Sequence, residues 1–360
     1  MSLDLPKTMH GVYLTGHGGL HKLEYRDDIP IPQPNVDDVI IKVGAAGINN
    51  TDINTRTAWY SKAVRQGTEI GAADGFNNIG DDGGWAGSLD FPIIQGADCC
   101  GKIVAVGADV NAGRIGERVL VRTMQANTRD NSDFSCITMG SERNGAFAQY
   151  MATKSVHALA INSDWSDIEL ASVPCAYSTA EGMLSRANVA NETVLVTGAS
   201  GGVGSAAVQL AKRRGATVIA VSTADKADAI IKLGADKVID RNTDFLEVLG
   251  TESLDVVADV VGGAKWPYFL DMLKRGGRYV TSGAIAGPIV ELDLRTLYLK
   301  DLSLLGSTYQ GDEIFTNLVA YIERKEIRPL VAKSYKLADI VQAQEDFISK
   351  QHVGKLVLIP

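Results

Sequence analysis

The amino-acid sequence predicts an α/β protein in which a doubly wound parallel sheet is joined to a second, β-rich domain. Three observations support this prediction. A strand–turn–helix–strand unit with a glycine-rich turn spans Thr193–Asn242, strands and helices keep alternating as far as Ser307, and short strand-like runs dominate residues 1–160. At 360 residues, the chain is long enough for two domains with separate hydrophobic cores.

The first 160 residues contain short apolar runs separated by Gly, Pro and Asp turns, as is typical of a β-rich domain. The segment Ser61–Asp90 is rich in Gly, Asp and Asn and lacks periodicity, so we expect a long loop that is either functional or mobile. Residues 165–190 have a helical pattern. The strands predicted in this part are Gly11–Thr15, Val39–Ala46, Gly101–Val106 and Arg118–Val121.

A dinucleotide-binding unit follows. Val194–Val196 is an uninterrupted apolar run, as a strand covered on both faces requires, and the helix Ser205–Arg214 and the strand Thr217–Val221 complete a βαβ unit. The turn after the first strand carries the glycine fingerprint that lets the backbone approach a pyrophosphate at a helix N-terminus. Its residues are Ala199, Ser200, Gly201, Gly202, Val203 and Gly204.

The end of the second strand indicates which dinucleotide binds. An NAD site usually offers a carboxylate there for the ribose 2′-hydroxyl, whereas this chain has Ser222 and Thr223, followed by Lys226. Hydroxyls and an ammonium can bind a 2′-phosphate that a carboxylate would repel. We therefore expect NADP(H) as the cofactor, with NAD(H) less favoured. The alternative is that Lys226 is a solvated lysine at the start of the next helix, beside Asp225.

The alternation of strands and helices continues after this unit and ends in a tail. The tail, from about Tyr309 onward, has two helical segments and a closing strand, and we expect it to return to the first domain and leave a ligand cleft between the two. The predicted elements are the strands Val256–Val261 and Leu302–Ser307, a turn with the next strand at Gly276–Gly283, the helices Trp266–Lys274, Ile314–Arg324 and Ala338–Ser349, and the closing strand Gly354–Ile359.

Composition excludes several classes of function. The net charge is −8 and no basic run occurs, which argues against a nucleic-acid partner. No apolar segment reaches membrane-spanning length, so no membrane association is expected, and the N-terminal residues lack a signal-peptide pattern. The four cysteines suggest no disulfide framework in a chain of this size. The expected location is cytoplasmic.

Several motifs in order resemble the medium-chain dehydrogenase/reductase superfamily over nearly the whole chain. The resemblance implies a GroES-like catalytic domain formed by residues 1–160 and 309–360, and a Rossmann domain formed by residues 161–308. The motifs that carry it, besides the nucleotide unit, are Ala46–Asp52, Gly96-Ala97-Asp98, Gly107, Gly116–Val119, Gly145–Tyr150 and Gly354–Leu358.

The zinc ligands of the superfamily's alcohol dehydrogenases are not preserved. The Cys, His and Cys that hold the catalytic metal fall at Asn49, Ala97 and Cys175, so two of three ligands are missing. The region around the structural zinc offers only Cys136. We predict no zinc at either site and expect Cys175 to be a small core residue at the start of a helix. With Asn at the first of these positions, the motif resembles that of the zinc-free NADPH:quinone oxidoreductases, which often carries Asn there.

The resemblance also implies which residues line the site. Asn49, Thr51 and Tyr60 are expected near the nicotinamide, although each has a structural alternative as a turn residue, a helix N-cap or a surface aromatic. Asp52 could be a structural carboxylate that pairs with Arg56. Expected cofactor contacts are Thr179, the run Ser282, Gly283 and Ala284, and Lys355, for which the alternative is a surface residue on an edge strand.

The function implied is NADP(H)-dependent reduction of quinones or α,β-unsaturated carbonyls by direct hydride transfer without zinc. A hydrogen bond from Thr51 or Asn49 would stabilise the enolate that develops on the substrate oxygen. The alternatives are an alcohol dehydrogenase-like enzyme and a non-catalytic NADP-binding protein. The resemblance further implies a homodimer that pairs through the sheet edge at Leu302–Ser307.

Overall fold

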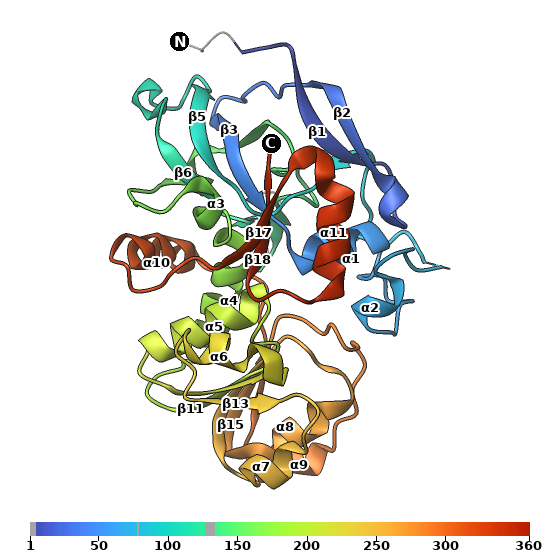
Figure 1. The fold of residues 1–360 in the computed structure, drawn as a ribbon, viewed down its shortest axis with the longest axis vertical. Coiled ribbons are helices and arrows are strands. Elements are labelled where there is room, and N and C mark those ends of the chain that lie inside the picture. Colours follow the sequence, from blue (N-terminus) through green and yellow to red (C-terminus); the bar gives the residue numbers. More distant parts are fainter. Residues whose placement is uncertain (1–4, 78, 127–133) are drawn as a thin grey trace.

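The computed structural model describes residues 5–77, 79–126 and 134–360. It has two parts, each built around its own sheet, and the helix α4 (Pro174–Arg186) lies where they meet (Figure 1). The lower part in Figure 1 holds the glycine-rich turn and the parallel strands, and the upper part combines the beginning and the end of the chain. The expected α/β architecture is confirmed.

The lower part is a six-stranded parallel sheet in the order β13-β12-β11-β14-β15-β16. The order reverses between β11 and β14, and ligands of such sheets bind at the carboxyl ends of the strands beside this point. The strands are β11 (Thr193–Val196), β12 (Thr217–Ser222), β13 (Lys237–Asp240), β14 (Leu254–Asp259), β15 (Leu273–Thr281) and β16 (Ser303–Gly306), connected through α5 (Gly202–Arg213), α6 (Ala227–Ile231), α7 (Phe245–Leu249), α8 (Trp266–Met272) and α9 (Leu294–Leu299).

The upper part contains a larger, mainly antiparallel sheet in the order β10-β6-β5-β3-β18-β17, with β9 also paired to β3, and a smaller sheet in the order β2-β1-β4. The closing strand β18 pairs with β3, so the tail does return to the first part of the chain (Figure 1). The strands are β1 (Thr8–Leu14), β2 (Leu23–Pro30), β3 (Asp38–Gly47), β4 (Ile93–Ile94), β5 (Cys100–Val106), β6 (Arg118–Val121), β7 (Met124–Ala126), β8 (Cys136–Thr138), β9 (Tyr150–Lys154), β10 (Ala158–Ala160), β17 (Val331–Lys336) and β18 (Lys355–Ile359).

The helix α4 is the main packing element between the two parts. It lies against α5 of the parallel sheet and against α10 (Asp312–Glu323) of the tail. Leu184, Val208 and Phe315, one from each of these helices, are buried in a single hydrophobic cluster. The other helices are α1 (Asn50–Thr57), α2 (Thr68–Gly71), α3 (Asp167–Leu170) and α11 (Ile340–Ser349). Because this core is shared, α4 holds a fixed position relative to both sheets.

Seven strands of the upper part have no counterpart in the sequence prediction: β2, β4, β7, β8, β9, β10 and β17. Five consecutive residues of β2 are exposed, and β17 buries only Tyr335, so neither has the alternation that signals a half-buried strand. The segment 61–90, expected to be a loop, contains only α2 as regular structure among its described residues. It contacts the lower part, because the Thr68 N–H donates to the Ile285 carbonyl at 2.9 Å.

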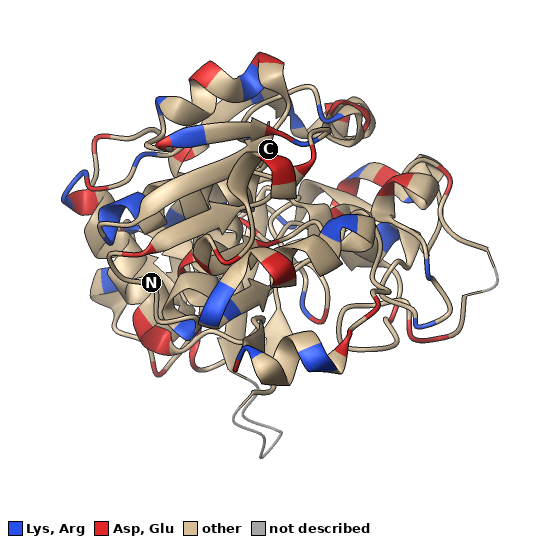
Figure 2. Ribbon diagram, turned by 90° about the horizontal axis from the view of Figure 1, so that it is seen from below, with Lys and Arg blue, Asp and Glu red and all other residues tan. Residues whose placement is uncertain are grey.

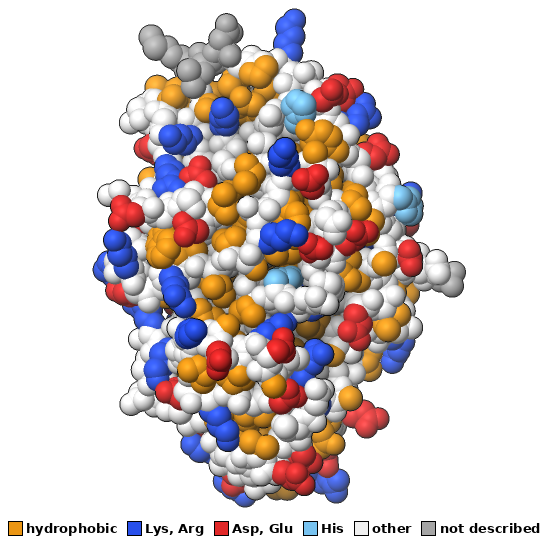
Figure 3. Space-filling model, viewed as in Figure 1, with side chains coloured by type: hydrophobic (Ala, Val, Ile, Leu, Met, Phe, Trp, Pro, Cys, Tyr) orange, Lys and Arg blue, Asp and Glu red, His pale blue; other side chains and the backbone are white. Residues whose placement is uncertain are grey.

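The surface and the cysteines agree with the composition. Basic and acidic side chains are intermingled along the ribbon (Figure 2) and over the face shown in Figure 3, without a large area of one sign. All four cysteines are free and buried. None of the helices in the described part of the chain combines the length and the apolar composition that crossing a bilayer requires.

Candidate active site

The glycine-rich turn has the shape of a phosphate-binding loop. It connects β11 to α5, and the Gly201 N–H donates to the Gly198 carbonyl at 3.0 Å. A Cβ on Gly204 would lie 2.2 Å from the Gly198 oxygen, so only glycine permits this close approach of helix and strand. The first N–H groups of α5 have no partner within the helix and provide a favourable site for an anion.

The carboxyl end of β12 presents polar groups that the protein leaves unused. The Ser222 hydroxyl is buried and, within the described residues, has no hydrogen-bond partner. The neighbouring Thr223 hydroxyl is likewise without a hydrogen-bond partner among the described residues. Lys226 Nζ donates to the backbone carbonyl of Lys350, which belongs to the tail. A buried hydroxyl without a partner fits a site completed by a ligand.

Lys350 was not singled out from the sequence. Its ammonium lies 3.3 Å from Asn50 Oδ1, and partial desolvation together with the charge of Lys226 lowers its pKa to about 8. Burial and the same two ammonium groups lower the pKa of His352 to about 4. Among the described carboxylates, none forms an ion pair with Lys226 or Lys350. Two uncompensated cations from different parts of the chain therefore meet here, and only the tertiary structure reveals this.

Lys355 lies at the centre of a buried polar network. Its ammonium donates to the Ile48 carbonyl at 2.7 Å, to Asp98 Oδ2 at 2.8 Å and to Asn49 Oδ1. The side chains of Lys355 and Asp98 are 3% and 0% exposed. The alternative in which Lys355 is a surface residue on an edge strand is wrong, because β18 lies between β3 and β17.

Asn49 and Asp98 use their polar atoms within this network. Asn49 Nδ2 donates to Asp98 Oδ2 at 2.8 Å while Asn49 Oδ1 accepts from Lys355. The other oxygen of Asp98 accepts the N–H of Cys175, the second residue of α4. The network therefore joins the link between β3 and α1, the segment before β5, β18 and the start of α4. Both polar atoms of the Asn49 amide are already engaged.

The residues at the zinc-ligand positions do not fit a catalytic zinc. Ala97 has no ligand atom, and the oxygen of Asn49 is occupied by the Lys355 ammonium. Burial raises the pKa of the Cys175 thiol, which favours the protonated form over the thiolate that binds metals. Within the described residues, no group of three or more His, Cys, Asp and Glu side chains could hold a metal ion. Part of the segment around the structural zinc position, residues 127–133, lies outside the described residues.

The predicted pairing of Asp52 with Arg56 does not form. The Asp52 carboxylate accepts the N–H of Asn49 at 2.7 Å and the N–H of Gly96 at 3.2 Å, and burial raises its pKa to about 7. Arg56 is fully buried and donates instead to Gln344 Oε1 and to two backbone carbonyls. Asp52 closes the first turn of α1 by accepting the N–H of the N-cap residue Asn49.

Thr51 and Tyr60 form a second pair near the network. The Tyr60 hydroxyl donates to Thr51 Oγ1 at 3.0 Å, and burial raises the pKa of Tyr60 to about 12. Tyr60 therefore stays a hydrogen-bond donor at neutral pH. Because the Thr51 oxygen accepts this bond, its own proton can be directed to a ligand. Thr179 lies four residues after Cys175, one turn further along α4.

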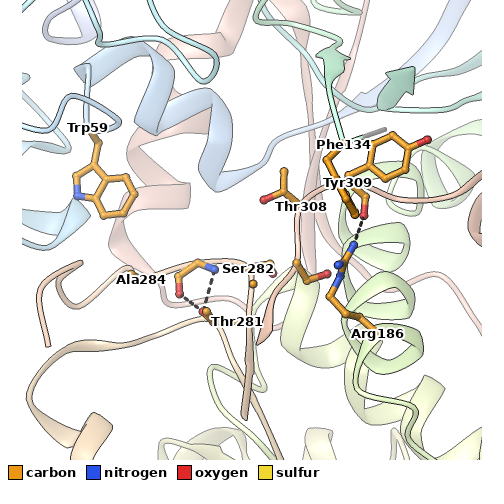
Figure 4. Close-up of a pocket in the computed structure, with 11 residues that line it drawn as sticks. Trp59, Phe134, Arg186, Thr281, Ser282, Ala284, Thr308 and Tyr309 are labelled. Atoms are coloured by element: carbon orange, nitrogen blue, oxygen red, sulfur yellow. Dashed lines mark hydrogen bonds between the residues drawn. The ribbon is translucent and has the colours of Figure 1, made fainter. Parts of the chain in front are cut away.

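A cavity of about 470 Å³ opens at the carboxyl ends of β15 and β16. Figure 4 shows Trp59 on one side, Arg186 and Tyr309 on the opposite side, and the turn Ser282–Ala284 between them. The predicted cofactor residues Ser282, Gly283 and Ala284 thus line a cavity, whereas Asn49, Thr51, Tyr60 and Thr179 are not among its lining residues. Trp59, Arg186, Thr308 and Tyr309 line it without having been predicted.

Comparison with known proteins identifies both parts of the chain. Residues 35–163 match the alcohol dehydrogenase GroES-like domain, and residues 202–324 match the family described as zinc-binding dehydrogenase. A crystal structure from Sinorhizobium meliloti 1021, assigned provisionally as an alcohol dehydrogenase, is 48% identical with a TM-score of 0.89, and the match covers 99% of this chain and 98% of that one.

Curated relatives match over the same extent. Acryloyl-coenzyme A reductase from Metallosphaera sedula is 28% identical, with 97% of this chain and 99% of that protein covered. Quinone oxidoreductase from Lama guanicoe is also 28% identical, with 98% of each chain covered.

Replacing Asp98 by Asn tests the buried network. The variant leaves the Lys355 ammonium buried among neutral acceptors, and we expect a loss of about 3–5 kcal/mol in the free energy of unfolding. Urea denaturation followed by circular dichroism measures it. The control is Asp164→Asn, which removes a carboxylate that is 90% exposed in its pair with Lys325 and should leave the free energy of unfolding nearly unchanged. An equal loss of unfolding free energy in both variants would contradict the view that Asp98 compensates the buried Lys355 charge.

Proposed function

Because the chain belongs to the medium-chain dehydrogenase/reductase superfamily, we propose that it is an NADP(H)-dependent reductase of α,β-unsaturated carbonyls or quinones that works without zinc. The observation that carries the proposal is the Lys355 ammonium, which is bound by Asn49 and Asp98 beside the positions of the missing metal ligands. An activated C=C bond or a quinone accepts hydride without a metal, whereas an alcohol needs a group that removes its proton. The quinone oxidoreductase and acryloyl-coenzyme A reductase relatives support the same chemistry.

The preference for NADP(H) rests on the end of β12. The free Ser222 hydroxyl and the Lys226 ammonium, with Lys350 close by, offer donors to a 2′-phosphate where an NAD site would offer a carboxylate. Lys350 comes from the tail and Lys226 from the parallel sheet, so a bound phosphate would be held from both parts of the chain. The glycine turn and the first turn of α5 would bind the pyrophosphate.

When bound, NADPH supplies a hydride to the β-carbon of an enone. The carbonyl oxygen of the substrate then gains negative charge, a proton from water is added at the α-carbon, and a saturated ketone is formed. We assign to Thr51 the hydrogen bond that stabilises this oxygen, because Tyr60 already donates to Thr51 and orients its hydroxyl. The amide of Asn49 is engaged by Lys355 and Asp98, so we assign it a positioning role.

The test is an NADPH oxidation assay on the full chain, with an enone, a quinone and, in the reverse direction, a primary alcohol with NADP+. We expect turnover of the enone or the quinone that survives removal of metals by a chelator, and tighter binding of NADPH than of NADH in a nicotinamide fluorescence titration. Alcohol oxidation that chelation abolishes would favour an alcohol dehydrogenase. NADPH binding without turnover of any substrate would favour a non-catalytic binding protein.

The exposed edge of the parallel sheet supports a homodimer. The edge strand β16 is partly exposed, and Leu294, Tyr298 and Leu299 of the adjacent helix α9 expose more than half of their surface. A second copy of this chain would pair its own β16 with this edge and cover these side chains. We expect twice the chain mass in light scattering, and a charged substitution, Leu305→Lys, should shift it toward the monomer. A monomeric parent protein would overturn this assignment.

Replacing Thr51 by Val tests the proposed oxygen-stabilising group. We expect kcat with an enone to fall by about 10²–10³, the effect of removing one hydrogen bond to a developing oxyanion, while the Kd of NADPH stays unchanged. Tyr60→Phe should lower kcat less, because Tyr60 acts through Thr51. An unchanged kcat in Thr51→Val would exclude this role.

The pH dependence of NADPH binding tests Lys350. Because the pKa of Lys350 is lowered to about 8, its positive charge is present below that pH and is lost as the pH rises. The Kd of NADPH should therefore increase between pH 7 and 9, as titration by fluorescence or calorimetry measures. In Lys350→Arg the charge persists throughout this range and the increase should be smaller. The same pH profile in both proteins would mean that another group is responsible.

A further inference from the structure

We propose that Arg186 binds an anionic group of the substrate at the mouth of the cavity, so that the preferred substrates are α,β-unsaturated carbonyls that carry an oxyanion remote from the reacting bond. The oxyanion is a carboxylate or a phosphate, since both offer the paired oxygens that a guanidinium binds. This inference rests on the proposed reductase function and specifies its substrate class.

The helix α4 places Arg186 at a defined distance from the reacting end. Cys175, Thr179, Met183 and Arg186 follow one another at intervals of four, four and three residues, so they lie along one face of the helix. Thr179 is an expected cofactor contact, and Met183 Sδ contacts the hydroxyl of Ser282 in the cavity at 3.0 Å. At about 1.5 Å of rise per residue, Arg186 lies about 10 Å further along the helix than Thr179.

The guanidinium of Arg186 has no carboxylate partner among the described residues. Its one hydrogen bond is long, 3.3 Å from Nη2 to the Tyr309 carbonyl, and its second contact is the face of the Phe134 ring at 5.8 Å. Two other arginines near the junction of the two parts do have such partners, since Arg122 pairs with Asp312 and Arg214 with Glu181. Arg186 is exposed at the cavity, so its charge is available to a ligand.

The rest of the cavity suits a substrate with one charged end. Trp59 and the residues Ser282–Ala284 line it away from Arg186, while Phe134 and Tyr309 stand beside the guanidinium with their rings 6.0 Å apart in an edge arrangement (Figure 4). No described acidic side chain lines the cavity to repel an anion. A conjugated carbonyl compound can thus lie along the Trp59 side while its oxyanion meets Arg186.

The experiment compares a negatively charged substrate with its neutral methyl ester. They are 4-phenylbut-3-en-2-one bearing a para-carboxylate and its para-methyl ester, assayed with NADPH and the full-length protein. We expect Arg186→Gln to lower kcat/KM for the carboxylate by about 10–100-fold, the effect of losing a hydrogen bond to a charged group, and to change kcat/KM for the ester little. In Arg186→Lys, kcat/KM for the carboxylate should lie between the values of the parent protein and of Arg186→Gln. In Arg186→Glu, the ester should become the better substrate.

The control variant is Arg275→Gln. Arg275 is also exposed and also donates to a single backbone carbonyl, that of Leu299, but it does not line the cavity. It should leave both kcat/KM values unchanged. If Arg186→Gln lowers kcat/KM for both substrates by the same factor, or for neither substrate, the anion-binding role of Arg186 is excluded.

A binding measurement separates this inference from the proposed function. Quenching of tryptophan fluorescence gives the Kd of each compound for the protein in complex with NADP+, where no reduction occurs. Tighter binding of the carboxylate that Arg186→Gln removes would support the anion site even if the reductase assay failed. Equal binding of acid and ester to the parent protein would overturn the anion site even if both compounds were reduced.

Discussion

The burial of one positive charge is the constraint on which the site depends. Transferring an ammonium out of water costs several kcal/mol unless acceptors surround it, and Lys355 finds three, on Ile48, Asn49 and Asp98. These acceptors come from the link between β3 and α1 and from the segment before β5, while Asp98 also accepts a hydrogen bond from the start of α4. The charge balance therefore holds the tail strand, the catalytic sheet and the linking helix in one arrangement, and the pair Thr51–Tyr60 stands beside it on a fixed base.

Positive charge is distributed differently at the other end of the site. Lys226 and Lys350 are drawn together by a hydrogen bond to a backbone carbonyl and lack a carboxylate partner among the described residues. Such an arrangement is unfavourable by itself and becomes favourable when an anion enters. The protein thus neutralises the cation at the proposed catalytic end and leaves Lys226 and Lys350 without a carboxylate at the proposed phosphate end. The difference arises because Lys355 has a buried carboxylate partner, Asp98, and the other two lysines have none among the described residues.

Sequence patterns predicted structure that depends on neighbouring residues and missed contacts between residues far apart in the chain. The βαβ unit with its glycine turn could be predicted because apolar periodicity and Gly spacing are properties of neighbouring residues. The polar strand β17 gave no such signal. The Asp52–Arg56 pairing was wrong because helical spacing says nothing of competing backbone donors. The burial of Lys355, the partnership of Lys226 with Lys350 and the position of Arg186 at a cavity depend on contacts between residues far apart in the chain, so no local pattern could reveal them.

The helix α4 has a consequence for selectivity that goes beyond charge. Its start is fastened by the bond from Cys175 to Asp98, and its body is packed between α5 and α10. Because its start is fixed and its body is packed, α4 sets the distance between its first residues and Arg186. With Arg186 at its far end, homologous acids of different chain length would be discriminated by geometry, and inserting one helical turn into α4 would move the optimum by about 5.4 Å.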